Sequence, residues 1–380
     1  MSARPLVFLW ENFGPNHLDR VEAVARGSRP VIGIEFAGTS EVYGWTRGEA
    51  AGVEIRTLRA IPARRRRAHL AWRLVQECWR LRRGDIFLCH YEQGPVLVAA
   101  LFLRLIGRPA FAMIESKFDD YPRRLAVELA KKLFVLPYRG VLTPTLRSRD
   151  YMRFLGFRPD RIALGYSALS VDRIAAMSGE PPAPDGVPFA ERDFAIVARL
   201  VPKKNIAMGL AAYAIWLRRT GRPRDLHLLG SGPLEGELRA QAQALGIAER
   251  VHFHGFVQTD AVSRRLGRSL CLLLPSVEEQ FGLVVIEAQA AGLPVLAARN
   301  VGACDVLVDP GINGFVLDPN NAESCAALML HLSEDEETWR RFATAARDGR
   351  YRGDARRFAE GVAVLTGQCP RDPASEDRAA

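Results

Sequence analysis

Long apolar runs and paired cysteines are both scarce in this sequence. No segment has the roughly 18 uninterrupted apolar residues that a membrane span needs, and the best candidate, residues 95–103, ends at Arg104. The apolar residues 6–10 are too few for a signal peptide. The six cysteines form no C-x-x-C pair, and no histidine cluster has zinc spacing. These absences predict a cytoplasmic protein without a transmembrane helix, a metal site or a disulfide framework.

The charge is unevenly distributed along an otherwise ordinary globular composition. The 380 residues, 48% hydrophobic and 25% charged, predict two or three domains. Residues 1–175 carry 29 Lys and Arg against 17 Asp and Glu, whereas the remainder carries 23 against 26. This asymmetry predicts an anionic partner for the first half of the chain.

Short apolar runs alternate with longer amphipathic stretches throughout the chain. The strands predicted in the first half are 6–10, 30–36, 86–90, 110–114 and 140–143. Those predicted in the second half are 194–200, 226–229, 251–256, 270–274 and 294–297, with helices at 206–219, 235–245 and 281–291. This alternation is typical of parallel sheets that are covered by helices on both faces.

A segment rich in proline and glycine, SGEPPAPDGVP at 178–188, divides the chain. We predict an α/β chain of two Rossmann-like domains, residues 1–175 and 191–345, that face each other across a cleft and are joined by a linker at 176–190. Residues 346–367 are expected to form a helix that can pack back on the first domain, and 368–380 a disordered tail. Open α/β sheets bind ligands at the carboxyl ends of their strands, so the loops there are the candidate sites.

One of these loops leads into an apolar segment that contains a carboxylate. A helix over residues 281–291 is apolar on nearly all sides and is therefore expected to be buried, so its Glu287 faces protein or a cleft. Glu279 lies just before this helix, whose free N–H groups attract anions. The alternatives are a favourable helix-terminal charge for Glu279 and a buried ion pair with an arginine for Glu287.

Three other strand ends carry candidate ligand-binding residues. VARLVPKKN, at 197–205, places the cations Arg199 and Lys204 five residues apart, which suits a diphosphate; the alternative is a solvated basic loop. LLGSGP, at 228–233, forms a glycine turn at Gly230. VHFHGF, at 251–256, ends in a glycine followed by Phe256, where a flat ring can approach the backbone.

Taken in order, these segments resemble the retaining glycosyltransferases of family 4, which have the GT-B architecture. The resemblance covers most of residues 190–320 and is carried above all by Glu279-x7-Glu287, which encloses a Phe-Gly pair. It implies that Arg199 and Lys204 neutralise a donor diphosphate and that Glu287 binds ribose hydroxyls. It also implies that the transferred sugar and its phosphate are held by Glu279 and by the backbone N–H groups of Phe281, Gly282 and Leu283.

The resemblance implies an activity as well. A sugar would pass with retention from a UDP- or GDP-linked donor to a hydroxyl of a saccharide, lipid-linked or small acceptor, in surface polysaccharide or glycolipid biosynthesis. The family needs no metal or other cofactor, and the sequence has no D-x-D triplet that would hold one. The alternatives are a sugar-nucleotide epimerase or phosphorylase of the same fold, or a non-catalytic sugar-nucleotide-binding protein.

The resemblance weakens in the first half of the chain. Gly14 is where the family lets the donor phosphate and the acceptor approach the backbone, and His17 is expected either to line the cleft or to lie on a helix surface. In MIESKFDD, at 113–120, many family members have a histidine where this chain has Glu115, Ser116 and Lys117. These three residues, together with Asp119 and His17, are the acceptor-side candidates, and the alternative for the segment 115–119 is a solvated loop.

A basic amphipathic helix is predicted at 63–84, where eight Arg accompany a single Glu. Such a helix can lie on anionic lipid at the inner face of the cell membrane, through Arg64, Arg65, Arg66 and Arg67. The alternative is that its apolar face packs on the sheet and its arginines are solvated. Nucleic acid is not expected as a partner, because no recognition module accompanies the charge.

Overall fold

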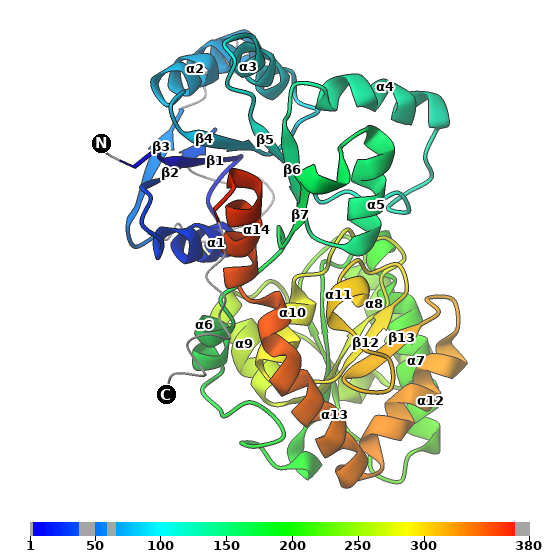
Figure 1. Ribbon diagram of the computed structural model, residues 1–380. Coiled ribbons are helices and arrows are strands. Elements are labelled where there is room, and N and C mark those ends of the chain that lie inside the picture. Colours follow the sequence, from blue (N-terminus) through cyan, green and yellow to red (C-terminus); the bar gives the residue numbers. More distant parts are fainter. Residues whose placement is uncertain (1–2, 38–49, 59–65, 369–380) are drawn as a thin grey trace. The chain divides into compact units, whose positions relative to one another are not determined.

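The chain forms two compact units, which are considered separately. The computed structural model describes residues 3–37, 50–58 and 66–368. Unit 1 comprises residues up to 118, residues 122–168 and those from 355 onward, and unit 2 comprises residues 119–121 and 169–354. Figure 1 shows a parallel sheet with its helices in each unit.

Unit 1 contains a seven-stranded parallel sheet in the order β3-β2-β1-β4-β5-β6-β7. Its strands are β1 (Leu6–Trp10), β2 (Val31–Glu35), β3 (Val53–Thr57), β4 (Asp85–Leu88), β5 (Phe111–Met113), β6 (Gly140–Thr143) and β7 (Ile162–Leu164). The sequence pattern missed β3 and β7, the two edge strands. Both are only partly buried, so neither has the continuous apolar run of a central parallel strand.

Helices cover both faces of this sheet. One layer consists of α2 (Arg66–Arg80), α3 (Gly94–Leu105), α4 (Leu125–Val135) and α5 (Leu146–Leu155), and the other of α1 (Pro15–Ala25) and α14 (Arg356–Thr366). Alternation along β1 separates the two layers. Val7 and Leu9 pack with the α2–α5 layer, whereas Phe8 and Trp10 pack with α1 and α14.

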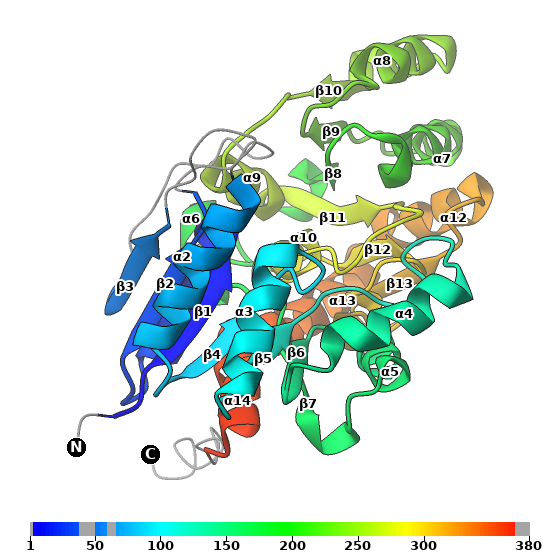
Figure 2. The same ribbon diagram turned by 90° about the horizontal axis from the view of Figure 1, so that it is seen from above.

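Unit 2 contains a six-stranded parallel sheet in the order β10-β9-β8-β11-β12-β13. Its strands are β8 (Asp193–Val197), β9 (Leu226–Leu229), β10 (Val251–Phe253), β11 (Ser269–Leu274), β12 (Val295–Ala298) and β13 (Gly314–Leu317). Its helices are α6 (Val171–Ser178), α7 (Ile206–Arg219), α8 (Glu235–Ala244), α9 (Thr259–Gly267), α10 (Val284–Ala290), α11 (Cys304–Leu307), α12 (Ala322–Ser333) and α13 (Glu336–Gly349). Figure 2 shows α7 and α8 on one face of the sheet and α6 and α9 on the other.

The prediction of two Rossmann-like α/β domains is confirmed, but the boundaries between the two units lie at other residues than those predicted. It enters unit 2 between Ala168 and Leu169, so the predicted linker 176–190 lies within unit 2 and begins inside α6. The predicted C-terminal helix 346–367 is two elements, the end of α13 in unit 2 and α14 in unit 1. The predicted tail lies outside the described residues except for Gln368. In the described ranges, no helix is both long enough and apolar enough to cross a membrane.

Candidate functional site

The strand order of unit 2 reverses between the neighbouring strands β8 and β11. From β8 the chain proceeds outward through β9 and β10, and from β11 it proceeds the opposite way through β12 and β13. Connections that diverge in this manner leave a crevice at the carboxyl ends of the two central strands. The loops that border this position are residues 198–205 and 275–283, which contain most of the residues predicted to bind the donor.

An ion pair joins these two loops. The Lys204 ammonium group donates to the Glu279 carboxylate, and only 13% and 16% of the two side chains are exposed. The adjacent pair, Lys203 Nζ and Glu278 Oε1 at 3.1 Å, is 41% and 38% exposed. The structure therefore brings together two residues, 75 positions apart in the chain, in a sheltered pair beside a more solvated one. Fixed charges are strongest where water is excluded.

Glycine at 230 lets the neighbouring loops approach each other closely. Gly230 has φ +140°, and a Cβ there would lie 2.0 Å from the Ala198 carbonyl oxygen. Its N–H donates to the Gly255 carbonyl at 2.8 Å, which ties the loop after β9 to the loop after β10. The next residue, Phe256, is exposed. The predicted glycine turn and its flanking aromatic ring thus lie at the same edge of the sheet as Lys204.

The segment from Glu279 to Leu283 is not the start of a helix, which corrects the predicted helix boundary. Helix α10 begins at Val284, three residues later than expected, because Gly282 has φ +96°, a left-handed conformation that no helix contains. Phe281 is buried, and its carbonyl accepts from the Ala303 N–H at 2.8 Å. The backbone N–H groups predicted to hold phosphate therefore belong to the loop before α10.

Two more of the predicted donor residues lie near this loop. Arg199 is exposed in the loop after β8, and Glu287 is half-buried in the first turn of α10. The expectation that Glu287 does not face open water agrees with this burial. Its role toward a ribose stays a prediction.

Sequence reasoning missed Asn205, which follows Lys204. Its backbone is left-handed, with φ +51°, and its side-chain amide donates to the carbonyls of Pro275 at 3.2 Å and Pro319 at 2.7 Å. Asn205 therefore fastens the loops after β8, β11 and β13. The available signal was an asparagine just before a predicted helix, since asparagine tolerates this conformation better than most residues.

The strand order of unit 1 reverses between β1 and β4, and here the edge of the sheet carries rings rather than an ion pair. Gly14 precedes α1, and its N–H donates to His17 Nδ1 at 3.2 Å. The His17 ring stacks on Trp10, with 4.8 Å between ring centroids. Burial, together with Arg20 and His90, holds the pKa of His17 well below its usual 6.5, so the imidazole is neutral. The helix-surface alternative does not describe this ring.

His90, which follows β4 at the same edge, was not among the predicted site residues. Its backbone has φ +58°, which is uncommon for a residue with a side chain. Burial alone would lower the pKa of His90, but Cys89, Glu92 and Glu11 outweigh burial and raise it to about 9. The edge of unit 1 thus holds a neutral and a charged imidazole within one cluster.

The acceptor-side candidates are only partly brought together. Glu115 Oε1 accepts from Ser167 Oγ at 2.6 Å, and Ser116 is half-buried. Lys117 is fully buried, so the solvated-loop alternative is wrong for it. Asp119 is exposed and belongs to unit 2, whereas the other three residues belong to unit 1.

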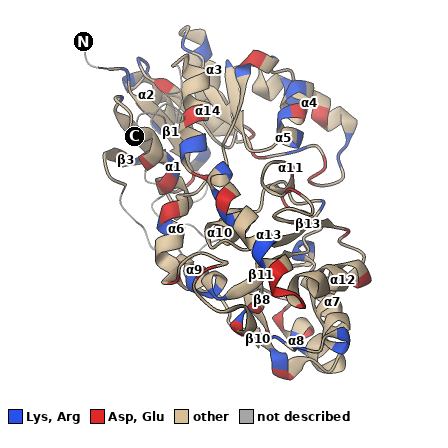
Figure 3. Ribbon diagram, turned by 60° about the horizontal axis from the view of Figure 1, so that its bottom comes forward, with Lys and Arg blue, Asp and Glu red and all other residues tan. Residues whose placement is uncertain are grey.

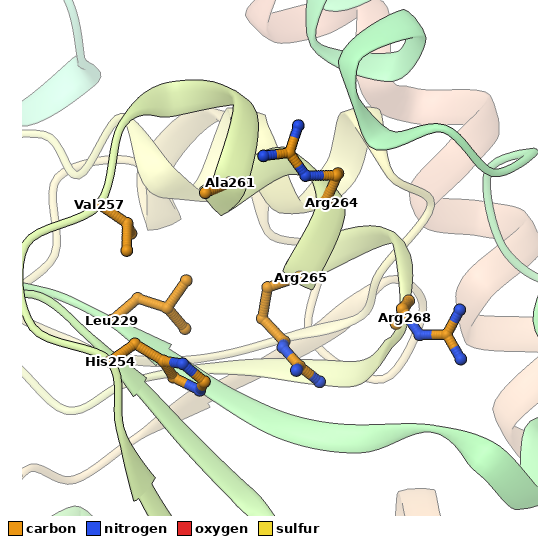
Figure 4. Close-up of a pocket in the computed structure, with 7 residues that line it drawn as sticks. All are labelled: Leu229, His254, Val257, Ala261, Arg264, Arg265 and Arg268. Carbon is orange, nitrogen blue, oxygen red and sulfur yellow. The ribbon is translucent and has the colours of Figure 1, made fainter.

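A pocket in unit 2 was not predicted at all. It lies between α9 and the ends of β9 and β10, and is lined by Leu229, His254, Val257, Ala261, Arg264, Arg265 and Arg268. Figure 4 shows the guanidinium group of Arg265 on the same side of α9 as Leu229 and His254. Arg265 contacts the His227 ring at Nε2, at 3.2 Å. The pocket adjoins the loops that contain Gly230 and Phe256, because Leu229, His254 and Val257 line it.

The second unit carries the signature of a known family. Residues 185–349 match the family model of the group 1 glycosyl transferases. The matched range contains Arg199, Lys204, Glu279 and Glu287. The predicted resemblance is thereby confirmed for unit 2.

Curated relatives of this chain include glycosyltransferases. D-inositol 3-phosphate glycosyltransferase of Streptomyces scabiei is 31% identical over 239 residues, which are 60% of this chain and 53% of that protein. O-antigen chain mannosyltransferase B of Escherichia coli is 28% identical over 209 residues, 54% of either chain. The chain thus spans about half the length of these relatives.

Solved structures extend the likeness to both units. The Anabaena protein Alr3699/HepE, crystallised in complex with UDP, has a TM-score of 0.71 at 19% identity and covers 97% of this chain and 100% of its own. Sucrose-phosphate synthase of Thermosynechococcus elongatus has a TM-score of 0.70 at 16% identity, with 99% and 100% covered. These likenesses confirm the predicted GT-B fold.

Proposed function

We propose that this protein is a retaining glycosyltransferase that moves a sugar from a nucleotide-diphosphate sugar to a hydroxyl acceptor, in surface polysaccharide or glycolipid biosynthesis. The observation that carries the proposal is the sheltered Lys204–Glu279 pair at the reversal between β8 and β11, within the range that matches the family model. The relatives named above support the same reaction class.

The pair suits the charges that change during transfer. As the glycosidic bond breaks, the leaving diphosphate gains negative charge, which preorganised cations stabilise. In the proposal, Lys204 and Arg199 bind this diphosphate. Once the diphosphate engages Lys204, the Glu279 carboxylate is available to accept from hydroxyls of the sugar. Glu287 binds the ribose.

Acceptor binding is assigned to unit 1, at the edge that contains Gly14 and His17. The leaving phosphate takes the proton of the acceptor hydroxyl as the new bond forms on the same face of the sugar, so the configuration is retained. This route needs no pair of carboxylates across the bond, unlike that of glycosidases. It also needs no metal or other cofactor. The protein would act in the cytoplasm, attached to an anionic membrane surface through Arg64–Arg67; residues 64 and 65 lie outside the described ranges.

A donor screen tests the proposal. UDP-sugars come first, because the structural relative Alr3699/HepE was solved with UDP, and GDP-sugars follow. We expect nucleoside diphosphate to be released faster when an acceptor is present, and NMR of the product to show the anomeric configuration of the donor. Conversion of the sugar without acceptor would indicate an epimerase, and dependence on inorganic phosphate a phosphorylase. Tight donor binding without release, across all donors and acceptors, would indicate a binding protein.

A further inference from the structure

Helix α4 of unit 1 exposes a stripe of leucines. Leu125, Leu129, Leu133 and Leu136 recur at helical spacing, and all four are exposed, Leu133 to 67%. The inward side of the helix carries Val135, which packs in the core of the α2–α5 layer. A helix on the surface of a globular domain normally turns its polar side outward. On α4 the outward side is apolar as well.

Helix α3, in the same layer, repeats this arrangement. Val98, Leu101 and Leu105 lie three and four residues apart, and Leu105 is 85% exposed. Ala99 and Leu103 of this helix are fully buried against the sheet. The exposed side chains therefore point away from the core, because the two sets occupy opposite sides of one helix.

Helix α2 adds two aromatic side chains. Trp72 and Trp79, seven residues apart, are both about half exposed, whereas Leu74 and Cys78 face the sheet. The Arg82 guanidinium lies 3.9 Å from the centroid of the Trp79 ring. α2 packs along α3, and Figures 1 and 2 show α2, α3 and α4 following one another across this layer.

The charge of unit 1 is concentrated in the same layer. Helices α2–α5 carry ten Lys and Arg against three Asp and Glu. Helices α1 and α14, which cover the opposite face, carry three against three, and Val364 is the one large apolar side chain that they expose. Figure 3 shows the basic positions on α3, α4 and α5. Exposed apolar stripes and excess positive charge thus occur together on one side of unit 1.

Because exposed apolar side chains and excess positive charge occur on the same face of unit 1, we propose that the α2–α4 surface docks on an anionic lipid bilayer. Its leucine and tryptophan side chains would lie at the acyl boundary, and its Lys and Arg side chains at the headgroups. Leucine with tryptophan supplies the apolar contact, and basic residues beside them supply the attraction to anionic headgroups. A second copy of this chain fits less well, because two strongly basic surfaces would repel each other.

This docking goes beyond the proposed transfer reaction, because it adds the exposed leucine and tryptophan side chains of α2–α4 to the basic contact proposed for Arg64–Arg67. If the proposed function holds, the docked protein would work at the surface where lipid-linked acceptors are found. Binding to vesicles requires neither donor nor turnover, so a failure of the docking proposal and a failure of the proposed function are distinguishable.

Cosedimentation with vesicles tests the docking. We expect the protein to bind vesicles of phosphatidylglycerol and phosphatidylcholine, to bind pure phosphatidylcholine much less, and to dissociate as salt rises. The double variant Leu105→Gln/Leu133→Gln should bind anionic vesicles about tenfold or more weakly. The matched control Val364→Gln, an equally simple change in the opposite layer, should bind like the wild type.

A second measurement covers the case in which the double variant misfolds. Vesicles that contain brominated anionic lipid should quench the tryptophan emission of the wild type, and Trp72→Phe should reduce that quenching. No binding to anionic vesicles, an equal loss in Val364→Gln, or a wild-type dimer that the double variant converts to monomers without any vesicle binding would each overturn the proposal.

Discussion

Units 1 and 2 have the same kind of parallel sheet, yet their edges differ in chemistry at the point where strand order reverses. In unit 2 this position holds the Lys204–Glu279 ion pair, between loops fastened by backbone contacts and by Asn205. In unit 1 the equivalent position holds His17 stacked on Trp10. The comparison teaches that the topology fixes where a site forms, whereas the loop residues fix which groups it can bind.

The difference matches the two partners that the proposed reaction requires. A paired cation and carboxylate suit a donor that carries both a diphosphate and sugar hydroxyls. The neutral His17 imidazole on the Trp10 ring suits the hydroxyls and the apolar face of an acceptor sugar, and the charged imidazole of His90 lies in the same cluster. The predictions below test this division, beginning with the largest expected effect.

The largest effect is expected from the sheltered lysine. Lys204→Ala should lower kcat by about 30- to 1000-fold, because losing a preorganised electrostatic donor costs roughly 2–4 kcal/mol of transition-state stabilisation. The matched control is Lys203→Ala, which removes the adjacent, more exposed lysine and should change kcat by no more than a few-fold. Nucleoside diphosphate release measures both variants. If kcat falls equally in the two, the lower solvent exposure of the Lys204–Glu279 pair does not determine its contribution to catalysis.

The next effect separates the two glutamates of unit 2. Glu279→Gln should lower kcat more than it raises KM, because the carboxylate interacts more strongly as positive charge builds on the sugar. Glu287→Gln should weaken binding of the free nucleoside diphosphate about tenfold, the usual worth of one charged hydrogen bond. Inhibition of both variants by that nucleotide decides between the roles. If only Glu279→Gln loses nucleotide affinity, the roles are reversed.

The sequence predicted the interior of the fold better than its edges. The predicted strands 6–10, 140–143 and 226–229 and the helix 206–219 coincide with β1, β6, β9 and α7, since buried parallel strands and long helices have strong patterns. The edge strands β3, β7 and β13 were missed, because half-exposed strands are short and mixed in composition. The start of α10 was misplaced because the left-handed conformation of Gly282 is a tertiary property.

The candidate site was predictable residue by residue but not as an arrangement. Lys204 and Glu279 could each be placed at a strand end, yet their pairing depends on β8 and β11 being neighbours, which no local pattern specifies. His90 and Asn205 were missed because their left-handed backbones arise only in the folded loops. The pocket beside Arg265 was not predicted because its lining comes from three segments, the end of β9, the loop after β10 and the α9 region, and none of them has a recognisable motif on its own.

A smaller effect is expected in unit 1, from the neutral state of His17. Because burial lowers the pKa of His17 in the folded protein, only the unfolded chain takes up this proton as pH falls below 6.5. The contribution of His17 to stability should therefore be fully present above pH 6.5 and decline below it, by at most about 1.4 kcal/mol per pH unit, whereas the raised pKa of His90 acts in the opposite direction, so the decline is read from the difference between the wild type and His17→Gln. Urea unfolding at pH 7.5 and 5.5 measures the decline. His17→Gln should reduce it, and an unchanged pH dependence would contradict a buried neutral imidazole.

The smallest expected effect is that of metal removal, because neither unit is proposed to use a metal ion in the transfer. The proposed chemistry assigns the charge of the leaving diphosphate to Lys204 and Arg199, side chains that need no divalent ion to act. Turnover in excess EDTA should therefore stay within about twofold of the untreated enzyme, since every stabilising interaction with the leaving group survives chelation. Complete loss of nucleoside diphosphate release, restored by Mg²⁺ or Mn²⁺, would mean that a metal supplies the charge assigned to the two cations. A matching loss in Lys204→Ala with metal present would then show that the lysine and the metal act together on the diphosphate, and the division of roles between the two units would still hold.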